Sequence, residues 1–124
     1  MAKNNEPTTF RYTSKYGNEA DVALAIEEYV MGGMAVQMWY KEHNEWLDED
    51  VWEPYADVTR FLLIVDDDEA FVDENNMPGI GEWLESNGLA EGTGYVCPSG
   101  YCVYPLYKFT PKFFEVAVDR RCEN

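Results

Sequence analysis

The alternation of apolar and polar positions in the first third of the chain predicts short β-strands. In residues 8–13, Phe10 and Tyr12 fall on one face of an extended segment. A turn around Gly17-Asn18 follows, and residues 34–40 then alternate in the same way as residues 8–13. The chain therefore begins with the pattern of an antiparallel sheet.

Residues 20–31 fit two different periods. Val22, Ile26 and Val30 lie on one helical stripe, but the same segment is also typical of one arm of a hairpin. Gly32-Gly33 can form its tight turn because glycine adopts positive φ without strain. We predict an antiparallel hairpin of residues 22–30 and 34–40, and a helix that ends at the first of these glycines is the alternative.

The centre of the chain predicts a loop, a long strand and a turn. Residues 41–51 are highly charged and indicate an acidic loop. Residues 52–65 have strong strand propensity, and their apolar end, residues 61–65, predicts a position in the sheet interior. Asp66-Asp67-Asp68 then predicts a turn.

The segment from Glu69 to Phe109 predicts a strand, a helix, a loop and a second strand. Residues 70–73 form the first strand, and residues 78–86 form a helix that starts at a proline and ends before Gly88. A loop rich in glycine and proline leads into the aromatic residues 101–109. Pro105 lacks a ladder donor, so it predicts an edge position or a bulge there. Thr110 and the proline after it predict a helix over residues 111–118.

These elements indicate one α+β domain over residues 1–124, mainly an antiparallel sheet with one or two short helices packed on it. We expect residues 1–7 to be frayed. The 124 residues are 46% hydrophobic and 15% aromatic, which is ample for a core. There is no apolar run of membrane-spanning length and no secretory signal pattern at the N-terminus. We therefore expect a cytoplasmic protein that does not bind membranes.

Charge is the most unusual feature of the composition. The chain carries 24 acidic and 9 basic residues, a formal net charge of −15. Between Glu42 and Glu74 there are 13 acidic residues and one basic residue, Arg60, whereas the balance from Gly100 onward is slightly basic. Such a protein repels nucleic acid and attracts basic protein surfaces. A uniformly acidic shell that only maintains solubility is the alternative.

Candidate catalytic and metal sites are weak. The three cysteines, Cys97, Cys102 and Cys122, favour free thiols, with a Cys97–Cys102 bridge as an alternative in an oxidising compartment. The single histidine, His43, lies in a polar segment, so no Cys–His or zinc pattern is evident. The acidic run before Phe71 lacks the central glycine of an EF-hand loop. We expect no cofactor, no metal and no enzymatic activity.

The second half of the chain resembles a known family. The motifs in order are Phe71-Val72-Asp73, Asn75-Asn76, Pro78, Trp83-Leu84, Asn87-Gly88-Leu89, Thr93-Gly94, Ser99-Gly100-Tyr101-Cys102 and Tyr104-Pro105-Leu106-Tyr107. They resemble a family of small uncharacterised bacterial proteins carried on plasmids and integrative elements of gut Firmicutes. The similarity spans about residues 30–108 and departs from the usual pattern in the acidic residues 42–51. The resemblance implies a mobile-element setting and supplies no catalytic residues.

The acidic segment carries the functional prediction. Carboxylates two apart on a strand stand about 6.6 Å from one another, on the order of successive phosphates. We therefore predict an acidic, nucleic-acid-mimicking inhibitor of a host defence nuclease of the restriction or CRISPR type. An interaction module without a defence target is the alternative, and a small enzyme or metal-binding protein is a third.

The predicted partner is a basic, nucleic-acid-binding host protein rather than nucleic acid itself, and the protein is expected to act as a monomer or small homo-oligomer. The predicted partner-binding residues are acidic or aromatic: Glu45, Trp46, Asp48, Glu49, Asp50, Trp52, Glu53, Asp57, Asp66, Asp67, Asp68 and Glu69. They are expected to lie together on one exposed surface.

Overall fold

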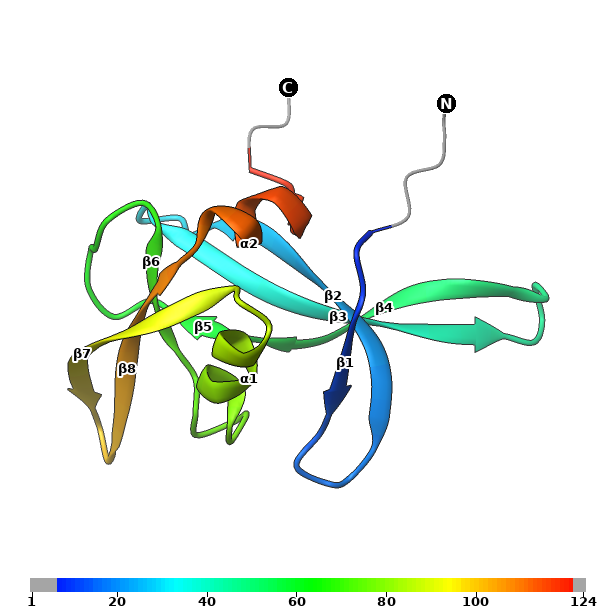
Figure 1. Ribbon diagram of the computed structural model, residues 1–124, viewed down its shortest axis with the longest axis horizontal. Coiled ribbons are helices and arrows are strands. Elements are labelled where there is room, and N and C mark those ends of the chain that lie inside the picture. Colours follow the sequence, from blue (N-terminus) through cyan, green and yellow to red (C-terminus); the bar gives the residue numbers. More distant parts are fainter. Residues whose placement is uncertain (1–6, 122–124) are drawn as a thin grey trace.

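Two sheets that share an apolar core make up the fold (Figure 1). The computed structural model describes residues 7–121. The first sheet contains β1 (Phe10–Thr13), β2 (Glu19–Glu28), β3 (Met34–Asn44), β4 (Glu49–Asp57) and β9 (Val118–Asp119). The second contains β5 (Thr59–Arg60), β6 (Glu69–Val72), β8 (Cys102–Phe109) and β7 (Ala90–Ser99), in that spatial order. The helices are α1 (Ile80–Ser86) and α2 (Pro111–Val116). The predicted α+β class is confirmed, with two sheets in place of the one expected.

The first predicted hairpin is confirmed. β2 and β3 pair antiparallel from Val22 with Tyr40 to Glu28 with Met34. Gly32 and Gly33 close the turn with φ values of 94° and 103°, which a residue with a side chain adopts only with strain. The segment also resembled a helix because Val22–Ile26 is buried on both faces, so the apolar–polar alternation of a half-exposed strand is missing.

The core lies between the first sheet and the elements of the second. Inward-facing side chains of β2 and β3 pack with those of β6, both helices and the start of β7. Phe109 and Phe113 make one of its central contacts, with ring centroids 4.6 Å apart. A smaller cluster of Phe71, Tyr104 and Leu106 lies apart from the main core. Both helices contribute side chains to this one core, so two short helices are enough to cover it.

The chain passes from the first sheet to the second at Val58 and Thr59, which are both buried. The Val58 amide donates to the Val36 carbonyl in β3 at 2.8 Å, and the Val58 carbonyl accepts from the Asp73 amide at 2.8 Å. The Thr59 hydroxyl oxygen accepts from the Val36 amide at 3.0 Å and lies 2.7 Å from the Tyr29 hydroxyl. These bonds join both sheets through two consecutive residues.

Three sequence predictions for connecting segments are wrong. Residues 41–51, predicted as a loop, belong mostly to β3 and β4, which pair from Asn44 with Glu49 onward. Residues 61–65, predicted as an interior strand, follow β5 as irregular chain, and Ile64 is 78% exposed. The predicted loop before β8 is the ten-residue strand β7. Each error arose because strand pairing, rather than local composition, decides whether a segment is extended.

The prediction for the aromatic strand is partly confirmed. Tyr104 and Leu106 are buried on one face of β8, whereas Val103 on the other face is 54% exposed. β8 is not an edge strand, because β6 and β7 flank it. Pro105 pairs with Val96 of β7, next to the point where the β7 register shifts between Gly92 and Val96. The prediction for Pro105 is therefore confirmed in part: β8 is a central strand, but its pairs with β6 end at Leu106, and the irregularity lies in β7 rather than in β8.

Both predicted helices are present, with shorter bounds. α1 begins at Ile80, because Pro78 belongs to the preceding turn. The Glu74 carboxylate caps this start by accepting from the amides of Gly79 and Gly81 at 2.8 and 2.6 Å. α2 has Thr110 as its N-cap, and the Thr110 side chain accepts from the Phe113 amide. The first six residues and Cys122 lie outside the described residues, so the predictions of a frayed terminus and a free Cys122 stay predictions.

Substitution of Thr59 by valine tests the junction between the sheets. Valine has nearly the same shape but removes the acceptor, which leaves the buried Val36 amide without its bond. We expect the free energy of unfolding to fall by about 1–3 kcal/mol, measured by urea denaturation. Amide exchange at Val36 should accelerate.

Substitution of Tyr29 by phenylalanine is the control, because it removes the second partner of Thr59 and keeps the bond to the Val36 amide. It should leave the Val36 exchange rate close to that of the wild type. An unchanged stability and unchanged Val36 exchange in Thr59→Val would show that the hydroxyl does not hold the junction.

Candidate partner-binding surface

A two-stranded ribbon projects from the body of the molecule (Figure 1). β2 pairs with β3 only as far as Tyr40, so beyond this point β3 pairs with β4 alone. We call residues 41–53 the acidic arm. At its tip Trp46 is 96% exposed and Leu47 is 60% exposed. Asp48 has a φ of 53°, the conformation that closes this turn.

The arm is acidic but contains internal pairs. His43 lies 3.2 Å from Asp50 and 3.4 Å from Asp48, and Lys41 lies 3.9 Å from Asp50. The Lys41 ammonium also lies 5.9 Å from the centroid of the Trp52 ring. These pairs are exposed, so each contributes little to stability. They mark one face of the ribbon as mixed in charge.

The predicted partner-binding residues form two separate groups rather than one surface. Glu45, Trp46, Asp48, Glu49, Asp50, Trp52 and Glu53 lie on the arm. Asp66, Asp67, Asp68 and Glu69 lie just before or at the start of β6, at the opposite end of the long axis (Figure 1). Asp57 ends β4 beside Gln37, 3.4 Å from its side-chain amide. The Asp68 carboxylate accepts from the Lys108 ammonium at 2.6 Å.

The arm does not repeat the spacing of phosphates. Along one face of β4, Glu49, Val51 and Glu53 follow one another, and the other face carries Asp50, Trp52 and Pro54. Carboxylates on the same face are therefore four residues apart, about 13 Å rather than about 6.6 Å. The spacing on which phosphate mimicry was predicted is absent from this strand.

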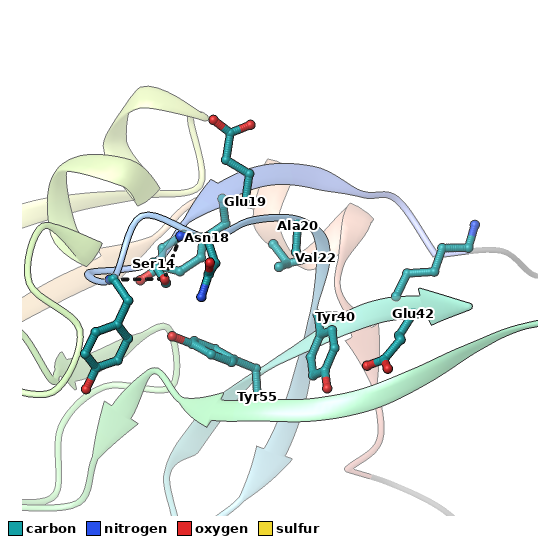
Figure 2. A pocket seen from close by; sticks show the side chains of 11 residues that line it. Ser14, Asn18, Glu19, Ala20, Val22, Tyr40, Glu42 and Tyr55 are labelled. Carbon is teal, nitrogen blue, oxygen red and sulfur yellow. Dashed lines mark hydrogen bonds between the residues drawn. The ribbon is translucent and has the colours of Figure 1, made fainter. Parts of the chain in front are cut away.

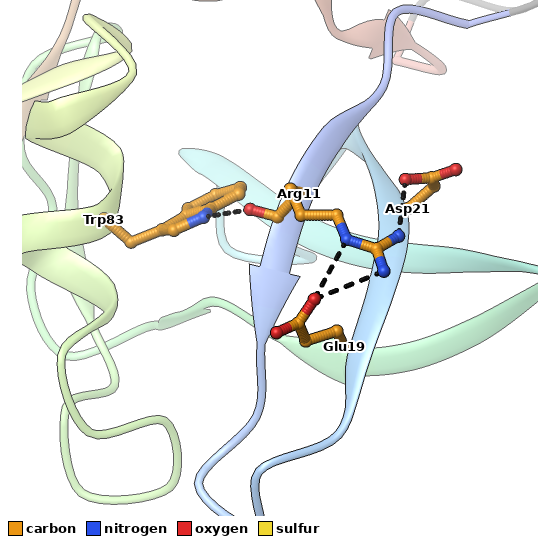
Figure 3. A network of polar contacts seen from close by, with 4 residues as sticks. All are labelled: Arg11, Glu19, Asp21 and Trp83. Carbon is orange, nitrogen blue, oxygen red and sulfur yellow. Dashed lines mark hydrogen bonds and ion pairs between the residues drawn. The ribbon is translucent and has the colours of Figure 1, made fainter.

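Several carboxylates outside the arm serve the fold. Asp73 is 4% exposed, lies 3.5 Å from the Arg60 guanidinium and accepts from the Asn76 amide at 3.1 Å. Arg11 binds both Glu19 and Asp21, and its carbonyl accepts from the Trp83 indole at 2.8 Å (Figure 3). Within residues 7–121, no three His, Cys, Asp or Glu side chains gather as a metal site requires. Cys97 and Cys102 are free thiols.

A pocket that the sequence did not indicate opens at the base of the arm (Figure 2). It has a volume of about 460 Å³. Three of its aromatic residues come from strands, Tyr12 from β1, Tyr40 from β3 and Tyr55 from β4, and Tyr16 comes from the β1–β2 turn. The centroid of the Tyr55 ring lies 6.1 Å from that of Tyr12 in a tilted pair and 6.4 Å from that of Tyr40 in an edge-to-face pair. Val22, which is fully buried, lines the pocket as well.

The rim of this tyrosine pocket is polar. The Ser14 hydroxyl accepts from the amides of Tyr16 and Asn18, which fixes the β1–β2 turn at the mouth (Figure 2). Glu42 lies on the same face of β3 as Tyr40. A hydrogen bond to Glu42 and the charge of this carboxylate raise the pKa of Tyr40. Burial is the main cause that raises the pKa of Tyr12.

Comparison with known sequences gives a family. The family described as Domain of unknown function (DUF4313) matches residues 23–123. The chain belongs to this family. No curated protein and no solved structure matches it. The DUF4313 match confirms the resemblance to an uncharacterised family.

The match begins inside β2 and leaves out β1, so one wall of the tyrosine pocket, Tyr12, lies outside the matched residues of DUF4313. Six other residues that line the pocket also precede the matched residues: Ser14, Tyr16, Asn18, Glu19, Ala20 and Val22. None of the helices in residues 7–121 is long and apolar enough to cross a bilayer.

Replacement of Glu42 by glutamine tests the electrostatics of the DUF4313 tyrosine pocket. The charge that opposes ionisation of the phenol disappears, so the pKa of Tyr40 should fall toward its ordinary value of 10.0. An NMR titration of the Tyr40 ring carbon measures this change. Glu53→Gln is the matched control and should lower the pKa less, because Glu53 acts through charge alone. An identical Tyr40 pKa in wild type and Glu42→Gln would contradict the assigned contact.

Proposed function

We propose that this protein is a non-enzymatic binding module that engages a basic protein through the acidic arm. The observation that carries the proposal is the arm itself, a projecting ribbon with exposed Trp46 and Leu47 at its tip among carboxylates. Large exposed aromatic side chains are the residues that anchor protein interfaces. Trp46 and Leu47 are too exposed to stabilise the fold by burial, so their place at the tip of a projecting hairpin favours a role in binding another molecule.

The net charge supports the choice of partner. At −15, the molecule attracts basic surfaces over distances comparable with the Debye length and repels nucleic acid and anionic lipid. Carboxylates at the rim of an interface mainly accelerate association, whereas buried aromatic anchors slow dissociation. The arm combines both, with acidic flanks around Trp46.

A narrower role is part of the proposal. In this role the protein is a cytoplasmic accessory of a mobile element and blocks a restriction or CRISPR nuclease by occupying its nucleic-acid groove. The acidity and the resemblance of the sequence support it. The interrupted carboxylate spacing of β4 favours the second candidate, a structural or regulatory interaction module without a defence target. Both candidate roles use the arm, and they differ in the site on the partner that the arm occupies.

Neutralisation of the arm tests the binding function. Asp48→Asn, Glu49→Gln and Asp50→Asn together remove three charges and no buried contact. Wild type and variant are used to capture proteins from a bacterial lysate at low and high salt, and captured proteins are identified by mass spectrometry. We expect a partner whose association rate with the triple variant is about tenfold slower at low salt, measured by surface plasmon resonance. The free energy of unfolding should stay level or rise.

The matched control removes the same charge elsewhere. Glu82→Gln, Glu91→Gln and Glu115→Gln are exposed positions outside the arm and outside the predicted partner-binding residues, and this variant should capture the same partner at nearly the wild-type rate. If all three proteins capture the same set, net charge alone is responsible and the arm is not a binding site. If only the control variant loses the partner, the partner binds outside the arm and the proposal is wrong.

Competition with duplex DNA separates the two roles. A nucleic-acid mimic occupies the nucleic-acid groove of its partner, so a short DNA duplex should displace the partner from the arm. The tighter the partner binds the duplex, the less duplex this displacement should need. Displacement should weaken as salt rises, because DNA binding releases counterions. An interaction module that binds elsewhere should form a ternary complex with the partner and the DNA. A ternary complex would exclude the inhibitory groove-binding role and leave the binding module intact.

A further inference from the structure

The tyrosine pocket has the features of a site for an organic cation. Tyr12, Tyr40 and Tyr55 surround a cavity of about 460 Å³, and neighbouring rings are inclined at 60° and 87° rather than stacked flat. The Tyr40–Tyr55 pair meets edge to face, so the faces these two rings offer to a ligand are the ones turned away from that contact and toward the cavity they line. A cation within about 6 Å of such faces is attracted by the ring quadrupoles.

The charged residues that line the pocket are Glu19, Glu42 and Lys41, and the Lys41 ammonium lies 3.9 Å from Asp50 and 5.9 Å from the centroid of the Trp52 ring on the arm. Because these partners hold Lys41, the charge at the mouth favours a positive occupant. Glu42 stands at its mouth beside the Tyr40 hydroxyl (Figure 2). Glu19 also lines the mouth, but its carboxylate points away from the cavity and binds Arg11 (Figures 2 and 3). Other cations of the protein lie over rings elsewhere, such as Arg60 over Tyr104 and Arg120 over Trp39, and Lys15 lies 5.5 Å from the centroid of Tyr16 at the rim of this pocket. The same chemistry is thus used on the surface of this molecule.

We propose that the tyrosine pocket receives an arginine side chain from the basic partner, and that Glu42 and the tyrosine hydroxyls accept its hydrogen bonds. The inference rests on the proposed function and names the group that is recognised. A guanidinium is planar, stacks on aromatic faces and carries five donors, so it suits tilted rings with a polar rim better than a compact ammonium does. The pocket lies at the base of the arm, so an extended basic segment can contact both at once.

Titration with a single amino-acid derivative tests the pocket without the partner. Acetyl-arginine amide is added to the whole protein, and the aromatic carbon–proton NMR signals are followed. Acetyl-citrulline amide is the control, because it has almost the same shape and no charge. We expect saturable shifts of Tyr12, Tyr40 and Tyr55 with arginine and much smaller shifts with citrulline.

Variants of Tyr55 test whether arginine binding needs an aromatic ring at this position or only an apolar side chain. Tyr55 is 42% exposed, so its replacement leaves the core intact. Tyr55→Leu should weaken arginine binding about tenfold, whereas Tyr55→Phe keeps the ring and should stay within about threefold of wild type. Tyr95→Leu, a 52% exposed position on β7, is the control and should bind as the wild type does.

Two results would overturn the inference. One is equal shifts with arginine and citrulline derivatives, which would indicate contact without recognition of charge. The other is undiminished arginine binding by Tyr55→Leu. The capture experiments on the arm are independent of both, so the pocket inference can fail while the binding function stands. Arginine recognition with no arm-dependent partner would overturn the binding function alone.

Discussion

The structure depends on the way in which the chain leaves the first sheet at Val58 and Thr59. Up to Asp57, β4 satisfies the exposed edge of β3 by backbone pairing. The Val58 amide continues that pairing at the Val36 carbonyl, and the Thr59 hydroxyl then takes the place of a backbone acceptor for the Val36 amide. A buried amide without a partner is costly, so this side chain allows the strand to depart without a defect.

The departure places both sheets over one core. Immediately after it, Thr59 and Arg60 pair with Val72 and Phe71, which begins the second sheet against the first. Trp83 of α1 secures the opposite side, since its ring lies 5.3 Å from that of Tyr12 and its indole donates to the Arg11 carbonyl. The first sheet is thus held at two points, and the distal part of the β3–β4 ribbon extends beyond both (Figure 1).

The acidity of the chain has more than one structural meaning. Some carboxylates are acceptors that complete the fold: Glu74 caps α1, Asp73 holds the turn before it, and Glu85 accepts from the Gly92 amide at 3.0 Å. Others form pairs, as Asp68 does with Lys108. In the arm, Asp48 and Asp50 pair with His43, but these pairs are exposed and complete no buried part of the fold. The arm and the adjoining tyrosine pocket are therefore the surfaces on which a binding function is proposed.

The sequence by itself determined the elements whose signals are local. Glycine at positive φ located the β2–β3 turn, Thr110 with its following proline located α2, and the proline before α1 with Gly88 after it located α1. Only the tertiary structure decided which segments are strands where the composition suggests otherwise. The charged residues of the arm are extended because β3 and β4 pair there. The apolar residues 61–65 are irregular because β5 ends at Arg60. The same holds for the sites. Acidic residues close in sequence are split between two ends of the molecule, and tyrosines from three strands meet in one pocket, because strand pairing sets these distances and sequence separation does not.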